Sequence, residues 1–231
     1  MLANQMITLI QRLHENNFIH RDVTPGNFLL GLEDKSNELF LIDFGYSKTF
    51  WDSKLRRHRP NRGSKNLVGT PEYASINAQN KQDLSRRDDL ESIGYILVYF
   101  MLGKLPWQNI DVDKPWQKKQ TIAKIMKSTL ISHLCKGLPK EFELYLNYCR
   151  KLKFEEEPDY PYLRSLFQNH LKTAPFKSVD TSVVNIQDVI NYVDNDKKEE
   201  EIIIRDVHNV SDSKYDIVIA KCNQLSLETD K

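Results

Sequence analysis

The spacing of hydrophobic residues predicts a chain that is mainly α-helical. Near the start, apolar side chains recur at steps of three and four residues, which indicates an amphipathic helix over residues 1 to about 17. Further helices are expected at about 116–127, 139–152 and 159–170, and Pro139 is suited to the first position of the middle one. Five apolar residues should form one buried face of that middle helix: Phe142, Tyr145, Leu146, Cys149 and Leu152.

The most hydrophobic helix is expected between Ser85 and Gly103. Ser85 is a suitable N-cap, and Asp88 and Asp89 follow it at the positive end of the helix dipole. Residues 93–102 are apolar on every face, which is typical of a helix in the middle of a core rather than at its edge. Gly103 is expected to end the helix.

Between these helical segments the pattern is weaker. Two short apolar runs at 28–30 and 39–42 are separated by a polar stretch and predict a small β-hairpin. Residues 45–82 hold no period for long, so a long loop is expected there, and loops of that length are commonly functional. The chain therefore reads as a helical body around one buried helix, with a hairpin and a long loop.

Residues 172–231 are expected to form a poorly defined C-terminal tail. The segment contains a charge run at 194–201 and a polar end, and only 202–204 and 217–219 resemble strands. A linker or a peripherally packed segment is the default interpretation of such a composition, and a regulatory role is the weaker alternative.

The composition excludes several classes of protein. A hydrophobic content of 40%, with ten Tyr and ten Phe, fits a globular chain rather than a disordered one. The 33 Lys and Arg against 32 Asp and Glu leave a net charge of +1, so no overall field favours nucleic acid or a membrane surface. The longest apolar run, residues 93–102, is shorter than the roughly 20 residues that a membrane-spanning helix needs. We expect neither nucleic acid nor membrane as a partner, and the oligomeric state stays open.

The three cysteines, Cys135, Cys149 and Cys222, match neither a zinc site nor a disulfide framework. Reduced thiols in an intracellular protein are the simplest interpretation. We expect a cytoplasmic protein. The basic run at 56–59 leaves nuclear import as an additional alternative, but such runs are common by chance.

Two short motifs carry candidate chemistry. Residues 20–27 read His-Arg-Asp-Val-Thr-Pro-Gly-Asn, and residues 43–45 read Asp-Phe-Gly. They match the catalytic loop H-R-D-x-x-x-x-N and the metal-binding D-F-G of protein kinases. The two motifs stand in the right order, about twenty residues apart, with a helix before the loop and two strands between them. A surface loop rich in capping residues would not explain the second motif.

The spacing suits phosphoryl transfer, which depends on positioning and charge neutralisation more than on covalent help. Asp22 would accept or orient the proton of the substrate hydroxyl. The amide oxygen of Asn27 and the carboxylate of Asp43 would hold Mg²⁺ between the phosphates of ATP, since hard oxygen ligands suit this ion. His20 and Arg21 are interpreted as structural residues.

Longer stretches resemble the casein kinase I family of Ser/Thr protein kinases. They are FIHRDVTPGNFLL at 18–30, NKQDLSRRDDLESIGYILVYFMLGKLPWQ at 80–108, LCKGLPKEF at 134–142 and PDYPYLRSLF at 158–167. Most kinases end the activation segment with Ala-Pro-Glu, whereas residues 74–77 read Ala-Ser-Ile-Asn, the form typical of casein kinase I.

The resemblance covers residues 1 to about 170 and implies a protein-kinase-like fold that is mainly α with a small β-hairpin. Residues 1–171 would form the C-terminal lobe, and the N-terminal lobe would be absent. Neither a glycine-rich loop over the phosphates nor the strand Lys and helix Glu of that lobe can be recognised. ATP and Mg²⁺ are the implied cofactors, and protein substrates, including acidic or pre-phosphorylated ones, are the implied partners.

Further site residues follow from the resemblance alone. Leu29 and Ile42 match positions that form the floor of the adenine site. Thr70 matches a position whose hydroxyl contacts the catalytic Asp, here Asp22. Asp89 matches the residue that braces the catalytic loop through hydrogen bonds.

Two substitutions depart from the family pattern. Thr24 stands where the family has a Lys that neutralises the transferred phosphoryl group, and losing one such contact typically costs about 10²- to 10³-fold in rate. Glu72 replaces an Arg that binds a phosphate or an acidic side chain of the substrate, while Lys118 matches a second position of that anion site. The basic residues between 48 and 65 would compensate in part or form a solvated loop. We therefore expect a weakened preference for acidic substrates.

Two functions remain open from the sequence. The favoured one is a fragment of an active casein-kinase-I-like enzyme, because Asp22, Asn27 and Asp43 are all retained. The alternative is a non-catalytic pseudokinase module that acts as a scaffold, which Thr24, Glu72 and the unrecognised N-terminal lobe would suit. In either case residues 1–231 alone are expected to be inactive or nearly so.

Overall fold

The structure, a computed structural model, describes residues 2–32, 35–112 and 114–173, with side chains as far as residue 168. Within these ranges the chain is mainly helical with short two-stranded antiparallel sheets. The two expected strands near the C-terminus, Cys222 and the predicted tail beyond residue 173 lie outside the described residues.

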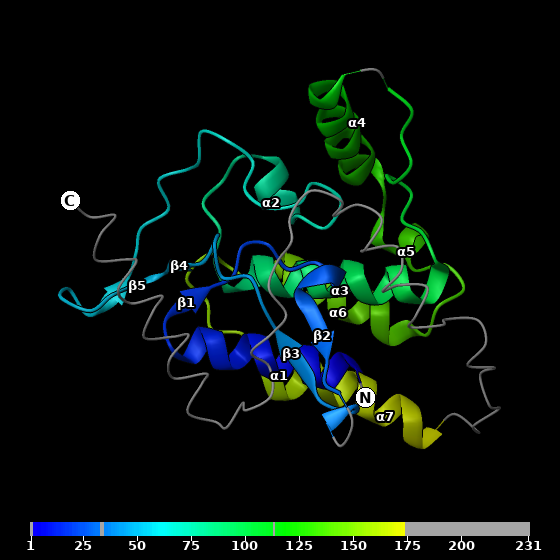
Figure 1. Cartoon of the computed structure of the whole chain (residues 1–231), viewed down its shortest axis with the longest axis horizontal. Helices are drawn as coiled ribbons and strands as arrows, with labels where there is room; N and C mark the ends of the chain where they lie inside the picture. The colour runs from blue at the N-terminus through cyan, green and yellow to red at the C-terminus, as the bar shows by residue number, and fades with distance from the viewer. Residues whose placement is uncertain (1, 33–34, 113, 174–231) are drawn as a thin grey trace. The chain divides into compact units, whose positions relative to one another are not determined.

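Four of the long helices pack together, and the fifth, α4 (Pro115–Ser128), packs against the short helix α2 (Ile76–Gln79) instead. Helix α3 (Arg86–Leu102) contacts both α6 (Lys140–Lys151) and α1 (Leu2–Glu15), as Figure 1 shows. Helix α7 (Tyr160–Thr173) packs against α1 and α6. The apolar stripes of α1 and α6 therefore face other helices, which is what their three- and four-residue spacing predicts.

Burial along α3 confirms most of the expectation for this helix. Every residue from 88 to 98 is buried. The last turn differs, because Met101 and Leu102 are 53% and 42% exposed. The expectation that the apolar segment is buried to its end is therefore wrong for these two residues.

Local contacts define the ends of α3 and its closest packing. At the start, the N–H of Ser85 donates to the carboxylate of Asp88 at 2.7 Å. At the end, Gly103 has a φ of +72°, a left-handed conformation that glycine adopts without strain. In the middle, a Cβ on Gly94 would lie 2.4 Å from a methyl carbon of Leu146, so the missing side chain allows α3 and α6 to approach closely.

The other expected helices are present, with small shifts at their ends. Helix α4 (Pro115–Ser128) lies where it was predicted, and α6 starts at Lys140 with Pro139 at the N-cap instead of inside the helix. The single turn α5 (Ile131–Leu134) was not predicted. All five residues of the expected face of α6 are buried, namely Phe142, Tyr145, Leu146, Cys149 and Leu152.

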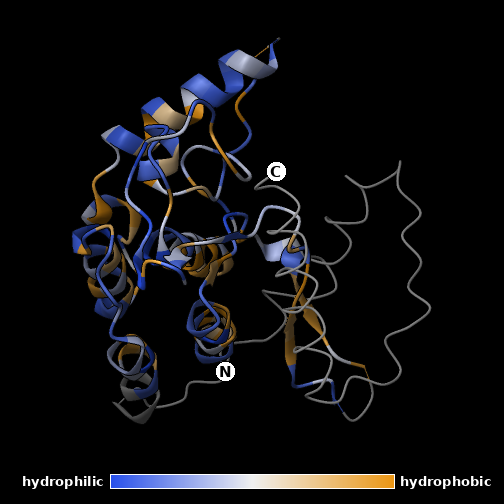
Figure 2. Ribbon diagram, turned by 90° about the vertical axis from the view of Figure 1, so that its left-hand side faces the viewer, coloured by the Kyte–Doolittle hydropathy of each residue, from blue (hydrophilic) through white to orange (hydrophobic). Residues whose placement is uncertain are grey.

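The predicted hairpin is confirmed. Strands β2 (Phe28–Leu30) and β3 (Leu39–Leu41) pair antiparallel, and the 3₁₀ turn at Pro25–Asn27 leads into β2. Figure 2 shows both strands as hydrophobic ribbon. The side chain of Gln5 in α1 donates to the carbonyl of Asn37 at 2.8 Å, which attaches the hairpin to the helical layer.

The long loop expected after the Asp-Phe-Gly motif contains regular structure, so that expectation is wrong in part. Strand β4 (Lys48–Thr49) pairs with β1 (Phe18–Ile19), and β5 (Trp51–Asp52) pairs with β6 (Arg57–His58). Helix α2 (Ile76–Gln79) follows. Elements of two to four residues are too short to show a hydrophobic period, and their partners decide them.

Candidate active site

The start of the loop over residues 20–27 is hydrogen-bonded to the carboxylate of Asp89, which lies in the first turn of α3. One oxygen of Asp89 accepts the N–H of His20 at 2.7 Å, and the other accepts the N–H of Arg21 at 2.8 Å. Arg21 has a φ of +70°, an uncommon conformation for this residue type that the two hydrogen bonds help to maintain. The contact expected between Asp89 and this loop is therefore present.

A buried chain of hydrogen bonds supports Asp89 from behind. The hydroxyl of Tyr160 donates to Nδ1 of His14 at 2.7 Å, and Nε2 of His14 donates to Asp89 at 2.9 Å. Burial lowers the pKa of His14, so the imidazole is neutral at pH 7, as this pattern of donors requires. Burial alone would raise the pKa of Asp89, but the hydrogen bonds from His14 and His20 hold the pKa below its usual value. Asp89 is therefore ionised.

His20 joins the loop to the end of β3. Its side chain is fully buried, and Nε2 donates to the carbonyl of Ile42 at 3.1 Å. Nδ1 accepts the N–H of Asp22 at 3.3 Å. Both ring nitrogens are thus used inside the protein, which agrees with the interpretation of His20 as a structural residue.

Asp22 contacts the chain beyond the Asp-Phe-Gly motif. Its Oδ1 accepts the backbone N–H and the hydroxyl of Thr70, both at 2.8 Å. Gly69 makes this approach possible, because a Cβ there would lie 2.4 Å from the carbonyl oxygen of Arg21, and its φ is +87°. No described residue donates a hydrogen bond to Oδ2 of Asp22. One carboxylate oxygen is therefore positioned by Thr70, and the other is available.

Asn27 and Asp43 are brought side by side by the backbone. The N–H of Ile42 donates to the carbonyl of Asn27 at 3.0 Å, which places the start of the Asp-Phe-Gly motif next to this residue. The side-chain NH₂ of Asn27 donates to the carbonyl of Asp22 at 2.8 Å, so its amide oxygen is left for another partner. Asp43 is exposed, and one of its oxygens accepts the N–H of Gly45 at 3.2 Å. An amide oxygen and a carboxylate form a donor set that fits Mg²⁺.

The described residues hold no group of three or more His, Cys, Asp or Glu side chains that would bind a metal by themselves. Mg²⁺ commonly takes one or two carboxylates and completes its shell with waters and phosphates. The pair Asn27 and Asp43 therefore suits an ion that arrives with a nucleotide.

The two residues expected under the adenine differ in exposure. Leu29 in β2 is 48% exposed, and Ile42 at the end of β3 is half-buried. Thr24 precedes the 3₁₀ turn in an extended conformation, and its side chain makes no capping hydrogen bond. Each of these three side chains is therefore at least partly exposed.

Lys118 and Glu72 form an ion pair. From the sequence, Lys118 was expected in an anion site, and Glu72 was a departure from the family pattern at that site. The Nζ of Lys118 lies 3.3 Å from a carboxylate oxygen of Glu72, and the carbonyl of Glu72 accepts the indole N–H of Trp107 at 2.7 Å. The Lys118 side chain is 46% exposed, so the pair is solvated and weak. An incoming anion would have to compete with Glu72 for Lys118.

The basic segment that follows the Asp-Phe-Gly motif includes the β5–β6 hairpin. Its basic side chains form no ion pair with a carboxylate within the described ranges. They are Lys48, Lys54, Arg56, Arg57, Arg59, Arg62 and Lys65. The positive charge expected here is therefore not neutralised by close contacts inside this part of the protein.

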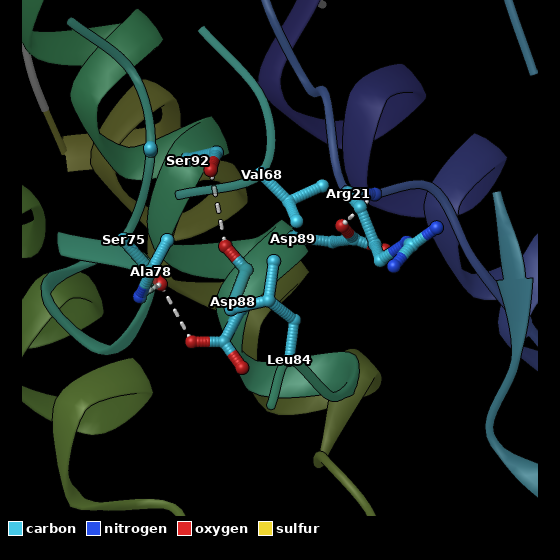
Figure 3. A pocket seen from close by; sticks show the side chains of 9 residues that line it. Arg21, Val68, Ser75, Ala78, Leu84, Asp88, Asp89 and Ser92 are labelled. Carbon is cyan, nitrogen blue, oxygen red and sulfur yellow. Dashed lines mark hydrogen bonds between the residues drawn. The ribbon is translucent and has the colours of Figure 1, made fainter. Parts of the chain in front are cut away.

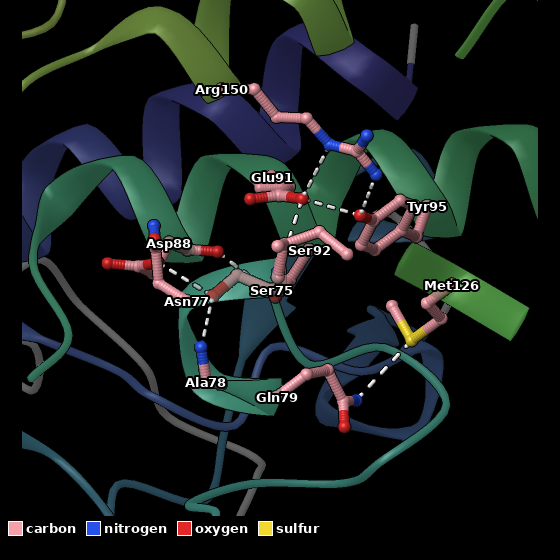
Figure 4. Close-up of polar contacts among 11 residues, drawn as sticks. Ser75, Asn77, Ala78, Gln79, Asp88, Glu91, Ser92, Tyr95, Met126 and Arg150 are labelled. Carbon is pink, nitrogen blue, oxygen red and sulfur yellow. Dashed lines mark hydrogen bonds and ion pairs between the residues drawn. The ribbon is translucent and has the colours of Figure 1, made fainter. Parts of the chain in front are cut away.

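Sequence reasoning missed the residues that hold the segment after Thr70. Figure 4 shows the hydroxyl of Ser75 and the amide of Asn77 donating to one oxygen of Asp88, at 2.6 and 2.9 Å. Glu91 accepts from Arg150 at 3.0 Å in the same region. Asp88 had been assigned only to the helix dipole. The signal that was available is the acidic composition of a helix that is otherwise apolar, since buried carboxylates need specific donors.

None of the described helices combines the length and the apolar composition that would let it cross a bilayer. Residues 1–173 match the family model described as "Protein kinase domain", which covers both motifs and every site residue named above. Because this match spans most of the 231 residues, the chain belongs to the protein kinase family.

Proposed function

We propose that the protein is a Ser/Thr protein kinase of the casein kinase I type, which transfers the γ-phosphate of ATP to Ser or Thr of protein substrates. The observation that carries this proposal is the pair of hydrogen bonds from Thr70 to one oxygen of Asp22, at 2.8 Å each. They hold the candidate acceptor carboxylate against the segment that would face a substrate. The sequence resemblance supports the subfamily and the Ser/Thr preference.

Asp22 would act through its second oxygen. Oδ1 is engaged by Thr70, so Oδ2 is the oxygen that can accept the proton of an incoming hydroxyl. Asn27 and Asp43 would hold Mg²⁺, which neutralises charge on the phosphates when it is bound with ATP. Leu29 and Ile42 would contact the adenine from below.

The described residues would supply the large lobe of such an enzyme. A kinase also needs a glycine-rich loop, a strand Lys and a helix Glu above the nucleotide, and these are not recognised within residues 1–231. We therefore expect these residues alone to transfer phosphate very slowly at most. The cytoplasm is the proposed location.

The substrate preference is proposed to be weaker for acidic or pre-phosphorylated segments than the resemblance implies. Glu72 would repel such a group and already pairs with Lys118 at 3.3 Å. The unpaired basic side chains between residues 48 and 65 would retain some attraction. A phosphate next to the target Ser should therefore change the KM for the peptide little. In Glu72→Arg, the same phosphate should lower that KM by a larger factor.

The test of this function is phosphate transfer to casein from labelled ATP in the presence of Mg²⁺. Residues 1–231 should give little signal alone and a clear signal when joined to the small lobe of a casein kinase I. Asp22→Asn in the joined protein should lower kcat by at least about 10³-fold, because the acceptor for the hydroxyl proton is lost. A matched control is Asp52→Asn, an exposed carboxylate of the β5 turn. An inactive joined protein that is folded and binds ATP would contradict the proposal.

A structural observation adds to the sequence features that suit a scaffold function. Leu29, Leu30 and Leu32 in and after β2 are 48%, 37% and 70% exposed, and clustered apolar side chains are commonly covered by another surface. In a pseudokinase this surface would bind a partner protein. A stable complex that does not require Asp22, together with an inactive joined protein, would support this second function.

A further inference from the structure

Asp88 is the main point of attachment between the segment after Thr70 and the central helix, because both Ser75 and Asn77 donate to it. Its Oδ1 accepts from the Ser75 hydroxyl at 2.6 Å and from the Asn77 amide at 2.9 Å, and its Oδ2 accepts the N–H of Ser85 at 2.7 Å. Ser75 is in turn the N-cap of α2, since its hydroxyl accepts the N–H of Ala78 at 3.1 Å. The Asp88 carboxylate thus holds the N-cap of α2, and Glu91 accepts the N–H of Ile76, the first residue of this helix, at 3.4 Å.

Asp88 and Asp89 are neighbours on α3 but hold different parts of the candidate site. Successive residues of a helix point about 100° apart, so the two carboxylates reach different sides. Asp89 holds the N–H groups at the start of the catalytic loop, and Asp88 holds Ser75 and Asn77. Figure 3 shows the small pocket that lies between the two attachments.

A short turn connects the Asp88 attachment to the site itself. The N–H groups of Tyr73 and Ala74 donate to the carbonyl of Thr70 at 3.0 and 2.9 Å. Thr70 is the residue that donates twice to Asp22. A continuous path of hydrogen bonds and one turn therefore runs from Asp88 through Ser75 and Thr70 to Asp22.

We propose that Asp88 is a positioning residue for the protein substrate, because its ionised carboxylate fixes the segment at 70–79 that would bind the substrate next to Asp22. This inference rests on the proposed kinase function. It assigns to Asp88 an effect on the peptide substrate and not on ATP, since the segment it holds is separate from Asn27 and Asp43.

The surroundings make this attachment sensitive to protonation. The donors to Asp88 are uncharged groups, and the nearest cation is Arg87, whose Nε lies 3.8 Å from Oδ2. Glu91 on the same helix carries a like charge. Arg21 lines the pocket on the catalytic-loop side, and the thiol of Cys149 in α6 is protonated because burial raises its pKa. Burial raises the pKa of Asp88 to about 6, while the hydrogen bonds from Ser75, Ser85 and Asn77 favour the ionised form. Because this pKa lies above the value of 3.8 for a solvated carboxylate, protonation should favour the closed attachment over an opened one.

The first test is hydrogen exchange on residues 1–231, which needs no enzyme activity. In Asp88→Asn, the amides of Ala78, Gln79 and Asn80 should exchange about tenfold faster at pH 7.5, because a charge-assisted hydrogen bond is lost. The amides of His20 and Arg21, which bond to Asp89, should be unchanged. Asn77→Ala, which leaves Asp88 in place, should give a smaller change of the same kind, and Asp52→Asn should give none.

The pH dependence separates this role from general destabilisation. After correction for the intrinsic exchange rate, wild-type exchange at Ala78–Asn80 should slow relative to that of Asp88→Asn as the pH falls from 7.5 to 5.5, because opening exposes Asp88 and protonation of the buried carboxylate favours the closed state. Equal acceleration in both the catalytic loop and α2, or no acceleration in α2, would overturn the proposal.

The second test uses the chain joined to a small lobe. Asp88→Asn should raise the KM for a peptide substrate about tenfold and leave the KM for ATP within about twofold. Asp88→Glu should restore part of the peptide affinity. If the joined wild-type protein is inactive, the proposed kinase function is rejected. The hydrogen-exchange result then still shows whether Asp88 holds the segment at 70–79. Equal increases in both KM values would reject substrate positioning by Asp88.

Discussion

Two adjacent carboxylates of α3 differ in pKa because their partners differ. Asp89 accepts two backbone N–H groups and the imidazole of His14, and these hydrogen bonds keep its pKa low although the residue is buried. Asp88 accepts from two side chains and one N–H, and burial prevails, so its pKa is about 6. The number and kind of donors therefore decide which buried carboxylate is sensitive to pH near neutrality.

The pKa of Asp88 gives a prediction for stability. Between its unfolded pKa of 3.8 and its folded pKa of about 6, the folded protein binds the additional proton, so stability rises as the pH falls through 6. The wild type should therefore gain about 1 kcal/mol in unfolding free energy relative to Asp88→Asn between pH 7.5 and pH 5. Urea unfolding of both proteins at the two pH values measures this difference.

Titration of His14 changes the unfolding free energy with pH in the opposite direction. This contribution cancels when the wild type is compared with Asp88→Asn. Burial lowers the pKa of His14, so its contribution is present above its unfolded pKa of 6.5 and is lost as the pH falls. Both proteins contain His14, so its effect cancels in the difference. An unfolding difference that does not change with pH would show that Asp88 does not titrate in this range.

Thr24 gives a second prediction at the scale of one residue. Its side chain is neutral, half-buried and free of a capping hydrogen bond, so a longer side chain can extend from this position. In the chain joined to a small lobe, Thr24→Lys should raise kcat by about 10²- to 10³-fold, because it adds a cation beside the transferred phosphoryl group. Thr24→Gln, of similar length without charge, is the control. A rate unchanged by Lys would show that this chain does not need the cation.

At the scale of elements, the structure depends on the close approach of α3 and α6. Gly94 allows it, and the methyl carbon of Leu146 would be 2.4 Å from a Cβ at this position. The ion pair between Arg150 and Glu91 joins the same two helices, with a separation of 3.0 Å. The first turn of α3 holds both loops of the candidate site, so the position of this helix affects the site as a whole.

Gly94→Ala should therefore destabilise the protein by about 1–3 kcal/mol through overpacking, despite the higher helix propensity of Ala. Thermal or urea unfolding measures the change. Leu146→Ala removes the obstructing methyl groups, so Gly94→Ala should cost less in that background. Additive effects of the two substitutions would contradict a steric origin.

At the scale of the whole molecule, the β2–β3 hairpin presents apolar side chains to solvent. Leu29, Leu30 and Leu32 are exposed, whereas Leu39 and Leu41 on the partner strand are buried. Leu29 and Leu30 follow one another in β2, so their side chains point to opposite faces of the hairpin. The exposure of these leucines is the structural observation that favours the scaffold alternative.

Leu30→Ser with Leu32→Ser should reduce self-association of residues 1–231 without lowering the unfolding free energy by more than about 0.5 kcal/mol, because exposed leucines contribute little to the core. Analytical ultracentrifugation measures the association. The buried control Leu41→Ser should be strongly destabilising. Unchanged association in the double variant would show that this surface is not adhesive.

The sequence by itself determined the long helices, the hairpin and the kinase motifs. Helices α1, α3, α4, α6 and α7 follow from hydrophobic spacing, because each must bury one continuous stripe or its whole surface. Asp22, Asn27 and Asp43 were identifiable because phosphoryl transfer requires these residue types at nearly constant spacing. The contact between Thr70 and Asp22 was expected from the resemblance alone.

Only the tertiary structure decided the rest. Strands β4, β5 and β6 exist through pairing, and residues as short as these have no period to recognise. The roles of Asp88 and Glu91 depend on donors 11 to 59 positions away in the chain, such as Asn77 and Arg150. A carboxylate on a helix looks the same in sequence whether it faces water or a buried loop. Packing decides whether the carboxylate of Asp88 faces water or a buried loop. Packing thereby also decides the pKa of this carboxylate, its attachment to the segment at 70–79 and its candidate effect on the substrate.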